Sequence, residues 1–292
     1  MKGVIDIGTN SVLLLLAERR PDGSLRVLRD ESRVTRLGQG AAASGELHPD
    51  AIERTLAVLA EYRQLAEAAG ATLEPVATEG LRMASNRDAF LEGARDVLGV
   101  DVQLISGDRE AELSYLSVAR EEEPGPLRVL DIGGGSTELV VGDGETIVSR
   151  CSHRIGSVRL TERWIDADPP TPGALRAMED AALEAFAKQP LEPAPVLHGL
   201  AGTVTTAAAL MLGLTSYARD RVDGTRWATD DVRHLRDMLA RETVAERMKR
   251  PCLPAGRADV IVAGATILWV ALRHCGATTL VVRDRGLRYA LV

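Results

Sequence analysis

The sequence predicts an α/β protein built from two related domains, and three observations lead to this expectation. The chain has 292 residues, which is more than one ordinary core needs and a comfortable length for two domains. One pattern of residues occurs twice, at 4–14 and again at 129–139. Apolar runs with strand character alternate with segments of helical period, which is typical of α/β proteins.

The repeated pattern reads Val4-Ile-Asp-Ile-Gly-Thr-Asn-Ser-Val-Leu-Leu14 in the first copy and Val129-Leu-Asp-Ile-Gly-Gly-Gly-Ser-Thr-Glu-Leu139 in the second. In each copy an apolar run ends in Asp, turns through glycine and resumes as another apolar run, which is a hairpin pattern. Long internal repeats indicate duplicated units. We therefore expect domains at 1–122 and 123–292, since the stretch 121–126 between the copies is charged and rich in Pro and Gly.

The remaining pattern supports this division. After a strand around Ser24–Leu28, a helix is expected to open at Pro49 and close at Gly70. Strands at Glu74–Ala77 and Val102–Ile105 then alternate with helices at Arg87–Leu98 and Asp108–Arg120. The second half is expected to contain strands at 127–131, 137–141 and 146–150, followed by helices at 172–188, 205–212, 230–241 and 257–274.

Composition excludes several classes of protein. A net charge of -7, a pI near 5.4 and 3% aromatic residues argue against a nucleic-acid binder, which needs a basic face or stacking platforms. The longest early apolar run, at 12–17, is too short for a membrane span and lacks the flanks of a signal peptide. The three cysteines are far apart and without zinc-ligand spacing, so we expect buried thiols. Together these features predict a cytoplasmic location and no membrane partner.

The two repeated loops have the residues of a phosphate-binding site. Backbone N–H groups in a glycine turn face an anion, and an aspartate at the end of the preceding strand holds the accompanying metal ion. Asp6 and Asp131 take that place in the two copies. The amides and hydroxyls that would contact phosphate belong to Gly8, Thr9, Asn10 and Ser11 in the first loop and to Gly133, Gly134, Gly135, Ser136 and Thr137 in the second. The alternative is that each loop is a plain hairpin turn whose glycines permit positive φ.

Other phosphate-handling mechanisms are not supported. The second loop lacks the third glycine of a dinucleotide fingerprint and continues into apolar residues at 139–141 instead of a helix. No Walker motif is present in the sequence, and no cysteine has an arginine six positions later. Asp166 and Asp168 are followed by two prolines and read as a surface turn.

Hydrolysis without a covalent nucleophile needs a base to direct water. Glu110 is the candidate, because it lies in the first turn of an expected helix after a strand, where α/β sites form. The alternative is an acid that only complements the helix dipole. Arg82, also after a strand, is a candidate phosphate clamp or a solvated surface charge. Gly202 and Thr203 lie at a third strand–glycine–helix junction, suited to an anion or a base, or simply to helix capping.

In combination these segments resemble the exopolyphosphatase/guanosine pentaphosphate phosphohydrolase family, in its short form, within the superfold of actin, Hsp70 and sugar kinases. The resemblance extends along the whole chain. It includes the motifs at 6–11, 36–40, 77–86, 105–111, 131–138, 155–160, 202–203 and 286–288. The chain departs from the family pattern at Arg109, at Glu79-Gly80 and at Tyr289-Ala290.

The resemblance implies two ribonuclease-H-like domains with a central cleft and an exopolyphosphatase that releases orthophosphate from inorganic polyphosphate, with pppGpp as a second substrate in some relatives. It implies dependence on Mg²⁺, with Mn²⁺ as the alternative ion, and leaves a homodimer open. Glu110 becomes the expected base, Arg82 a phosphate ligand, and Asp131 and Glu138, with Asp6, the metal site. Two alternatives stay open, namely an ATP-dependent kinase or ATPase of the same superfold and a non-catalytic phosphate or alarmone sensor.

Overall fold

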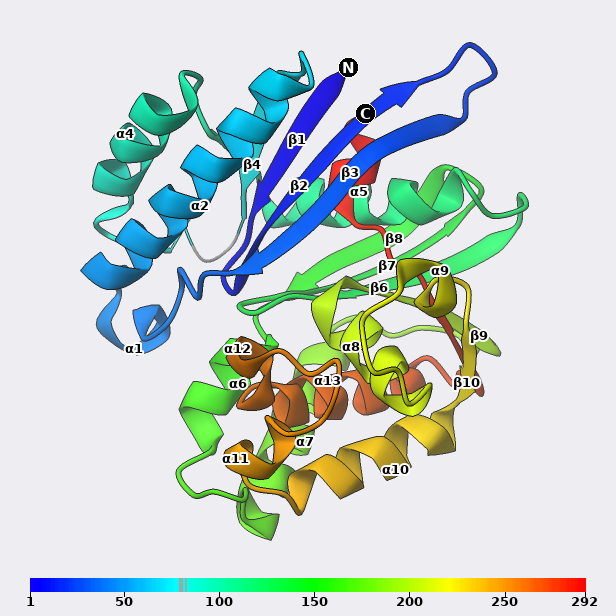
Figure 1. Ribbon diagram of the computed structural model, residues 1–292. Coiled ribbons are helices and arrows are strands. Elements are labelled where there is room, and N and C mark those ends of the chain that lie inside the picture. The colour runs from blue at the N-terminus through cyan, green and yellow to red at the C-terminus, as the bar shows by residue number, and fades with distance from the viewer. Residues whose placement is uncertain (79–80, 82) are drawn as a thin grey trace. The chain divides into compact units, whose positions relative to one another are not determined.

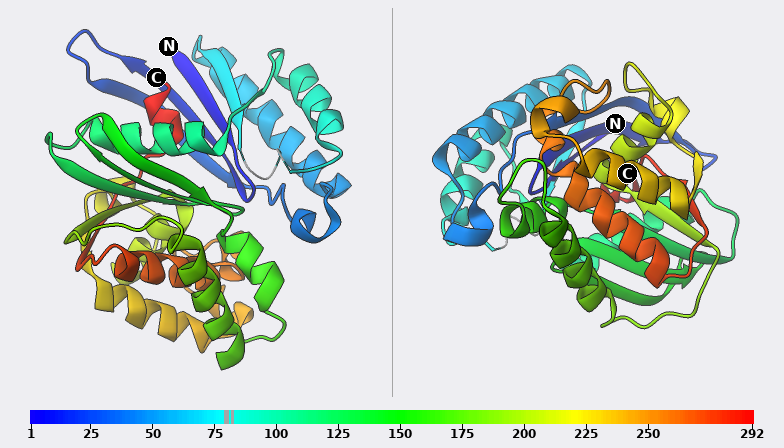
Figure 2. Two further views of the ribbon diagram at one scale, coloured as in Figure 1. Left: turned by 180° about the vertical axis from the view of Figure 1, so that it is seen from behind. Right: turned by 90° about the horizontal axis from the view of Figure 1, so that it is seen from below.

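The computed structural model describes residues 1–78, 81 and 83–292, which form two compact α/β units (Figures 1 and 2). The first unit comprises Met1–Leu113 and Leu287–Val292, and the second comprises Ser114–Gly286. The boundary between them falls within helix α5 (Gly107–Ala119), and the chain returns to the first unit for its final segment. The expected boundary at 122/123 lies just after that helix.

The sheet of the first unit begins with the expected hairpin. Strands β1 (Lys2–Ile7), β2 (Ser11–Arg19) and β3 (Leu25–Val34) pair antiparallel in sequence order. Strand β4 (Thr72–Ala77) adds parallel to β1, and the short β5 (Gln103–Leu104) adds parallel to β4, which gives the order β3-β2-β1-β4-β5. The loop after β1 therefore lies at the carboxyl end of the central strand.

The helices of the first unit are α1 (Ala41–Ser44), α2 (Pro49–Ala68), α4 (Arg87–Leu98), the first half of α5 and α14 (Leu287–Ala290). Pro49 opens α2 as expected, and the His48 side chain accepts the Asp50 N–H. Leu59 and Tyr62 of α2 and Phe90 of α4 are fully buried and join one core with apolar residues of β1 and β2. Figure 1 shows α2 and α4 side by side, and this burial explains why the helical period predicted both.

The sheet of the second unit repeats the scheme. Strands β6 (Pro126–Ile132), β7 (Thr137–Asp143) and β8 (Thr146–His153) pair antiparallel, and β9 (Val196–Leu200) lies parallel to β6. Strand β11 (Thr279–Val282) is parallel to β9, and β10 (Arg226–Ala228) adds an antiparallel edge. The order β8-β7-β6-β9-β11 is that of the first unit, so the duplication read from the sequence is confirmed.

Helices of the second unit cover its sheet in Figure 1. Besides the second half of α5, they are α6 (Ser157–Trp164), α7 (Pro172–Phe186), α8 (Ala201–Met211), α9 (Arg219–Val222), α10 (Thr229–Ala240), α11 (Val244–Arg247), α12 (Ala255–Ala258) and α13 (Ile261–His274). Nearly every residue of α13 is buried, and it packs against α7, α10 and α6. The helix expected at 257–274 is thus two helices, because Asp259 and Val260 separate α12 from α13. The short, polar α6 was not expected.

A glycine after the third strand of each unit packs directly on the phosphate-loop candidate. A Cβ on Gly38 would lie 2.3 Å from Thr9 Cγ2, and the Gly38 N–H donates to the Thr9 carbonyl at 2.8 Å. In the second unit a Cβ on Gly156 would lie 2.3 Å from the Gly134 carbonyl oxygen. The N–H groups of Val158 and Arg159 donate to that same oxygen at 3.0 and 3.1 Å. The backbone at Gly38 and at Gly156 therefore packs against the loop of its unit, at a distance that only glycine allows.

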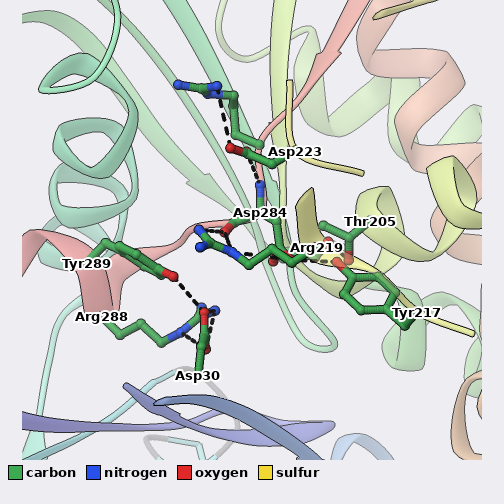
Figure 3. A network of polar contacts seen from close by, with 10 residues as sticks. Asp30, Thr205, Tyr217, Arg219, Asp223, Asp284, Arg288 and Tyr289 are labelled. Carbon is green, nitrogen blue, oxygen red and sulfur yellow. Dashed lines mark hydrogen bonds and ion pairs between the residues drawn. The ribbon is translucent and has the colours of Figure 1, made fainter. Parts of the chain in front are cut away.

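The final helix is fastened to β3 of the first unit by a buried ion pair, drawn in Figure 3. Arg288 Nη2 donates to both carboxylate oxygens of Asp30 at 2.9 and 3.0 Å, and the Tyr289 hydroxyl donates to Asp30 Oδ2 at 2.6 Å. Arg288 and Tyr289 are 4% and 3% exposed. The charge of Arg288 is thus removed from water and is paired with the carboxylate of Asp30.

The three cysteines differ in how far they are buried. Only Cys275 is buried, and burial raises the pKa of its thiol to about 11, whereas Cys151 and Cys252 are half-buried. The expectation of buried thiols was therefore right for one cysteine of the three. Within the described residues no helix has both the length and the apolar character needed to cross a membrane.

Replacing Gly156 by Ala is expected to lower the free energy of unfolding of the second unit by about 1–3 kcal/mol, because the methyl group meets backbone that cannot move without shifting the loop. Gly156 has an ordinary extended φ of -154°, so the effect is steric. Gly173→Ala is the matched control, since a Cβ there meets nothing closer than 3.7 Å. Urea denaturation followed by circular dichroism measures both. Equal stability of the two variants would contradict the proposed support of the loop.

Replacing Asp30 by Ala is expected to destabilise the first unit by about 3 kcal/mol, because it removes a carboxylate that pairs with the buried guanidinium of Arg288 and accepts the Tyr289 hydroxyl. The control is Glu31→Ala on the same strand, whose ion pairs with Arg29 and Arg33 involve exposed arginines. That change should cost less than about 1 kcal/mol. Thermal denaturation of both variants tests the difference, and a small, similar shift in both would show that the anchor contributes little.

Candidate functional site

The two loops close with the same backbone hydrogen bond. Gly8 N–H donates to the Ser11 carbonyl at 3.0 Å, and Gly133 N–H donates to the Ser136 carbonyl at 3.0 Å. A Cβ on either glycine would lie 3.1 Å from that same oxygen. The residues that recur in the sequence thus form the same hydrogen-bonded turn in both units, after β1 in the first and after β6 in the second.

The strands that enter and leave the loops place two acids side by side in the second unit. In the register of β6 and β7, Asp131 lies directly opposite Glu138, whereas its counterpart Asp6 lies opposite Leu13. Directly opposed residues have Cβ atoms about 4.5–5.5 Å apart on one face of the sheet. Glu138 is 1% exposed and Asp131 is half-buried. The second loop is therefore joined to a carboxylate pair, and the first loop to a single carboxylate.

Each carboxylate of the pair accepts a short hydrogen bond from a serine. Ser114 Oγ donates to Asp131 Oδ2 at 2.5 Å, and Ser152 Oγ donates to Glu138 Oε1 at 2.6 Å. Ser114 comes from α5, and Ser152 lies opposite Glu138 on β8. Both acids are thus oriented by groups of their own unit.

The second loop is largely enclosed. Gly134 and Gly135 are buried, and Ser136 is 3% exposed. The hydroxyl of Thr137 donates to the Ile155 carbonyl at 2.7 Å, which ties the start of β7 to the turn before α6. This hydroxyl has a bond within the protein, so Thr137 shapes the loop, whatever contact it makes with a ligand.

The first loop is held by the segment after β3. The Asn10 carbonyl accepts the N–H groups of Thr35 and Arg36 at 3.1 and 2.9 Å. Arg36 has a φ of 56°, rare for a residue with a side chain. In the described part of the chain the Asn10 Oδ1 atom is buried without a hydrogen-bond partner. Such an atom is costly unless a donor or cation reaches it, which is consistent with a binding loop.

Glu110 occupies the expected place at the start of α5. Ser106 precedes the helix, accepts the Arg109 N–H on its hydroxyl at 3.1 Å and receives the Glu110 N–H on its carbonyl at 2.9 Å. Glu110 is 8% exposed, whereas Asp108 in the same turn is exposed. An acid that only complements the helix dipole has no reason to be buried. Arg82, the other catalytic candidate, lies outside the described residues.

The third junction forms the first turn of α8. The helix begins directly after β9, so Gly202 and Thr203 lie within its first turn, and Ala201 has a strained φ of 67°. Arg257 Nη1 donates to the Gly202 carbonyl and to Thr206 Oγ1, both at 2.8 Å. Burial lowers the pKa of Arg257. A buried guanidinium thus lies beside the N-terminus of this helix, the end at which backbone N–H groups are available to an anion.

Beside this turn the Tyr217 hydroxyl donates to Asp284 Oδ2 at 2.6 Å, and burial raises the pKa of Tyr217 (Figure 3). Arg219 donates to the Asp284 carbonyl at 2.7 Å, and Asp284 N–H donates to Asp223 at 2.8 Å. These bonds fix the segment that follows β11.

The donor set fits a hard divalent cation. Among the described residues no three His, Cys, Asp or Glu side chains converge into a cage. Mg²⁺ is usually bound by one or two carboxylates together with water and substrate phosphates. Asp131 and Glu138 supply two adjacent carboxylates beside a glycine loop, which is the set that such binding needs.

Some residues of the site were not expected from the sequence. Ser114 follows Glu110 by four positions on an expected helix, so helical spacing was a usable signal. Ser152 and Arg257 gave none, because strand register and packing bring them to Glu138 and Gly202.

Comparison with known proteins agrees with the geometry. The sequence pattern of the Ppx/GppA phosphatase family matches residues 16–292. The chain is 38% identical to Exopolyphosphatase 2 of Mycobacterium tuberculosis over 279 residues, which cover 90% of this chain and 87% of that protein. It is 30% identical to Exopolyphosphatase 1 of Mycobacterium bovis, covering 99% of this chain and 86% of the relative.

Solved structures show the same fold. The crystal structure of the Aquifex aeolicus member of the Ppx/GppA family superposes with a TM-score of 0.83 at 34% identity, covering 99% of this chain and 95% of the other. An exopolyphosphatase from Cytophaga hutchinsonii superposes with a TM-score of 0.88 at 25% identity, covering 99% and 95%. The expected fold class, two actin-like α/β domains, is confirmed. With the family pattern and these relatives spanning nearly all of the sequence, the chain belongs to the Ppx/GppA phosphatase family.

Proposed function

We propose that this protein is an exopolyphosphatase that hydrolyses the terminal phosphate of inorganic polyphosphate and releases orthophosphate in the presence of Mg²⁺. The observation that carries the proposal is the carboxylate pair Asp131–Glu138 joined to a glycine loop whose closing hydrogen bond recurs at Gly8. Relatives named exopolyphosphatase support the substrate.

The loops supply the binding groups. Phosphoryl transfer needs mainly positioning and charge stabilisation, and the amides of residues 8–11 and 133–136, together with the first turn of α8, offer fixed donors. Because backbone donors do not have to reorganise when a ligand binds, they stabilise phosphate charge at little entropic cost. We propose that each loop contacts phosphate through these amides and that Arg82 is a phosphate ligand.

Glu110 is proposed as the base. Its carboxylate would accept a proton from water as the water oxygen forms a bond to the terminal phosphorus and the bridging P–O bond breaks. The shortened chain keeps the bridging oxygen, and orthophosphate leaves. Burial of Glu110 supports this role, because few water molecules compete for the carboxylate.

Asp131 and Glu138 are proposed to hold Mg²⁺, with Asp6 as a further ligand directly or through water. The ion would neutralise charge on the phosphate oxygens. The protein's part is to present two adjacent carboxylates in a fixed orientation, and the strand register of β6 and β7 does this without a flexible loop.

The guanosine alarmone pppGpp is proposed as a second substrate, because it ends in the same phosphoanhydride and the chain belongs to the Ppx/GppA phosphatase family. The N-terminus of α8, with Arg257 bonded to the Gly202 carbonyl, supports additional contacts to a nucleotide. Polyphosphate remains the substrate that we propose first.

Replacing Glu110 by Gln is expected to lower kcat for orthophosphate release by about 10²–10⁴-fold with little change in substrate binding. Gln keeps the size of the side chain and removes its basicity. The control is Glu112→Gln on the same helix, where the acid is partly exposed and pairs with Arg109 at 3.0 Å. Full activity of the Glu110 variant would remove Glu110 as the base. Binding without turnover in the wild type would instead indicate a phosphate or alarmone sensor.

Purified protein with Mg²⁺ is expected to release orthophosphate from short and long polyphosphate and from pppGpp, and much less from ATP. Removal of divalent ions with EDTA should abolish release, and Mg²⁺ or Mn²⁺ should restore it. The control for ionic strength is the EDTA-treated protein with monovalent salt added in place of the divalent ion. Turnover of ATP alone would favour a kinase or ATPase of this fold, and turnover unaffected by EDTA would contradict the metal site.

A further inference from the structure

The acids of the β6–β7 pair share a feature that metal-ligand chemistry alone does not require. Each accepts a hydrogen bond from a neutral serine hydroxyl, at 2.5 Å for Asp131 and 2.6 Å for Glu138. Bonds to ionised acceptors are short and about twice as strong as neutral ones. Both hydroxyls therefore restrain the carboxylates tightly.

We propose that Ser114 and Ser152 are positioning residues that fix the two carboxylates in the orientation that binds the divalent cation. The inference rests on the proposed metal site and adds two residues to it. Neither serine belongs to the duplicated loop, and neither is expected to contact phosphate.

The strands arrange three of these side chains in one row. Asp131 lies opposite Glu138, and Glu138 lies opposite Ser152, so the three residues share one face across β6, β7 and β8. Helix α5 approaches that face, because Tyr115 bonds the Gly144 carbonyl at 2.6 Å, next to Ser114. Ser114 is fully buried, at 0% exposed. Ser152, at the end of this row, therefore bonds Glu138, and Ser114 from helix α5 bonds Asp131.

A neutral donor suits this task better than a cation. Two like charges directly opposite in a sheet repel each other, and a basic side chain would relieve the repulsion but also cancel the charge that attracts Mg²⁺. A hydroxyl holds one oxygen of each acid and leaves the negative charge in place. Outer partners of this kind typically change metal affinity or activity by about 10–100-fold when removed.

Helix α5 also connects the base to this arrangement. Glu110 and Ser114 are four residues apart, so they project from the same side of the helix, one turn from each other. A shift of α5 along its axis would therefore move the proposed base and the Asp131 hydrogen bond together.

The test measures cation binding directly, without substrate. The variants are Ser114→Ala and Ser152→Ala, and the probe is Mn²⁺, followed by the paramagnetic resonance signal of the free ion. The controls remove a hydroxyl from the same elements without touching either acid. They are Ser117→Ala on α5, whose hydroxyl bonds the Ser114 carbonyl at 2.7 Å, and Ser149→Ala on β8, whose hydroxyl bonds Gln189 at 3.0 Å.

We expect each test variant to bind Mn²⁺ about 10–100-fold more weakly than the wild type, and each control to bind within about twofold of it. Half-maximal Mg²⁺ for orthophosphate release should rise in parallel, while KM for polyphosphate measured at saturating Mg²⁺ stays unchanged. A serine that only stabilised the fold would lower the melting temperature without this selective change in metal affinity.

Unchanged Mn²⁺ affinity in folded Ser114→Ala and Ser152→Ala protein would overturn the inference, as would a wild type that binds no Mn²⁺. If Ser114→Ala fails to fold, Ser152→Ala decides, because Ser152 is only half-buried. Weakened Mn²⁺ binding in a protein that releases no phosphate would instead support the serines and reject the proposed function, so the two failures are distinguishable.

Discussion

The hydrogen bond from the Gly133 N–H to the Ser136 carbonyl, repeated between Gly8 and Ser11, is the constraint on which the site depends. It closes a turn at the end of a central strand and fixes the direction in which the neighbouring amides point. A Cβ at the first position of either turn would lie 3.1 Å from that carbonyl oxygen, a tight contact that favours glycine there. Fixed backbone amides of this kind can contact an anion without a charged side chain.

Duplication of this turn did not produce two equal halves. The residue opposite the strand-ending aspartate is Leu13 in the first unit and Glu138 in the second. One change at one register position separates a loop with a single acid from a loop with a carboxylate pair. The duplicated scaffold therefore carries different acids in its two units: a carboxylate pair beside the second loop, and a buried Glu110 at the start of α5.

The segments that pack against the two loops are as specific in sequence as the loops themselves. Gly38 and Gly156 both come after the third strand of their units, and both pack against loop atoms at distances that exclude any side chain. Asp30, Arg288 and Tyr289 perform a similar task for the final helix, with a buried ion pair in place of close backbone packing. Rigid support keeps the amides aligned, and alignment is what electrostatic stabilisation of a phosphoryl group requires.

The sequence by itself determined the fold class, the duplication, the two loops, the long helices α2, α4 and α5 and the candidate acids Glu110 and Asp131, whereas Glu138 was a candidate only through the family resemblance. These follow from local periodicity and from letters that recur in register, which need no knowledge of distant contacts. Tertiary structure alone decided that Ser152 bonds Glu138, that Arg257 lies on Gly202 and that α12 and α13 are separate helices. Strand register and packing bring such residues together across tens of positions, and no local pattern records that pairing.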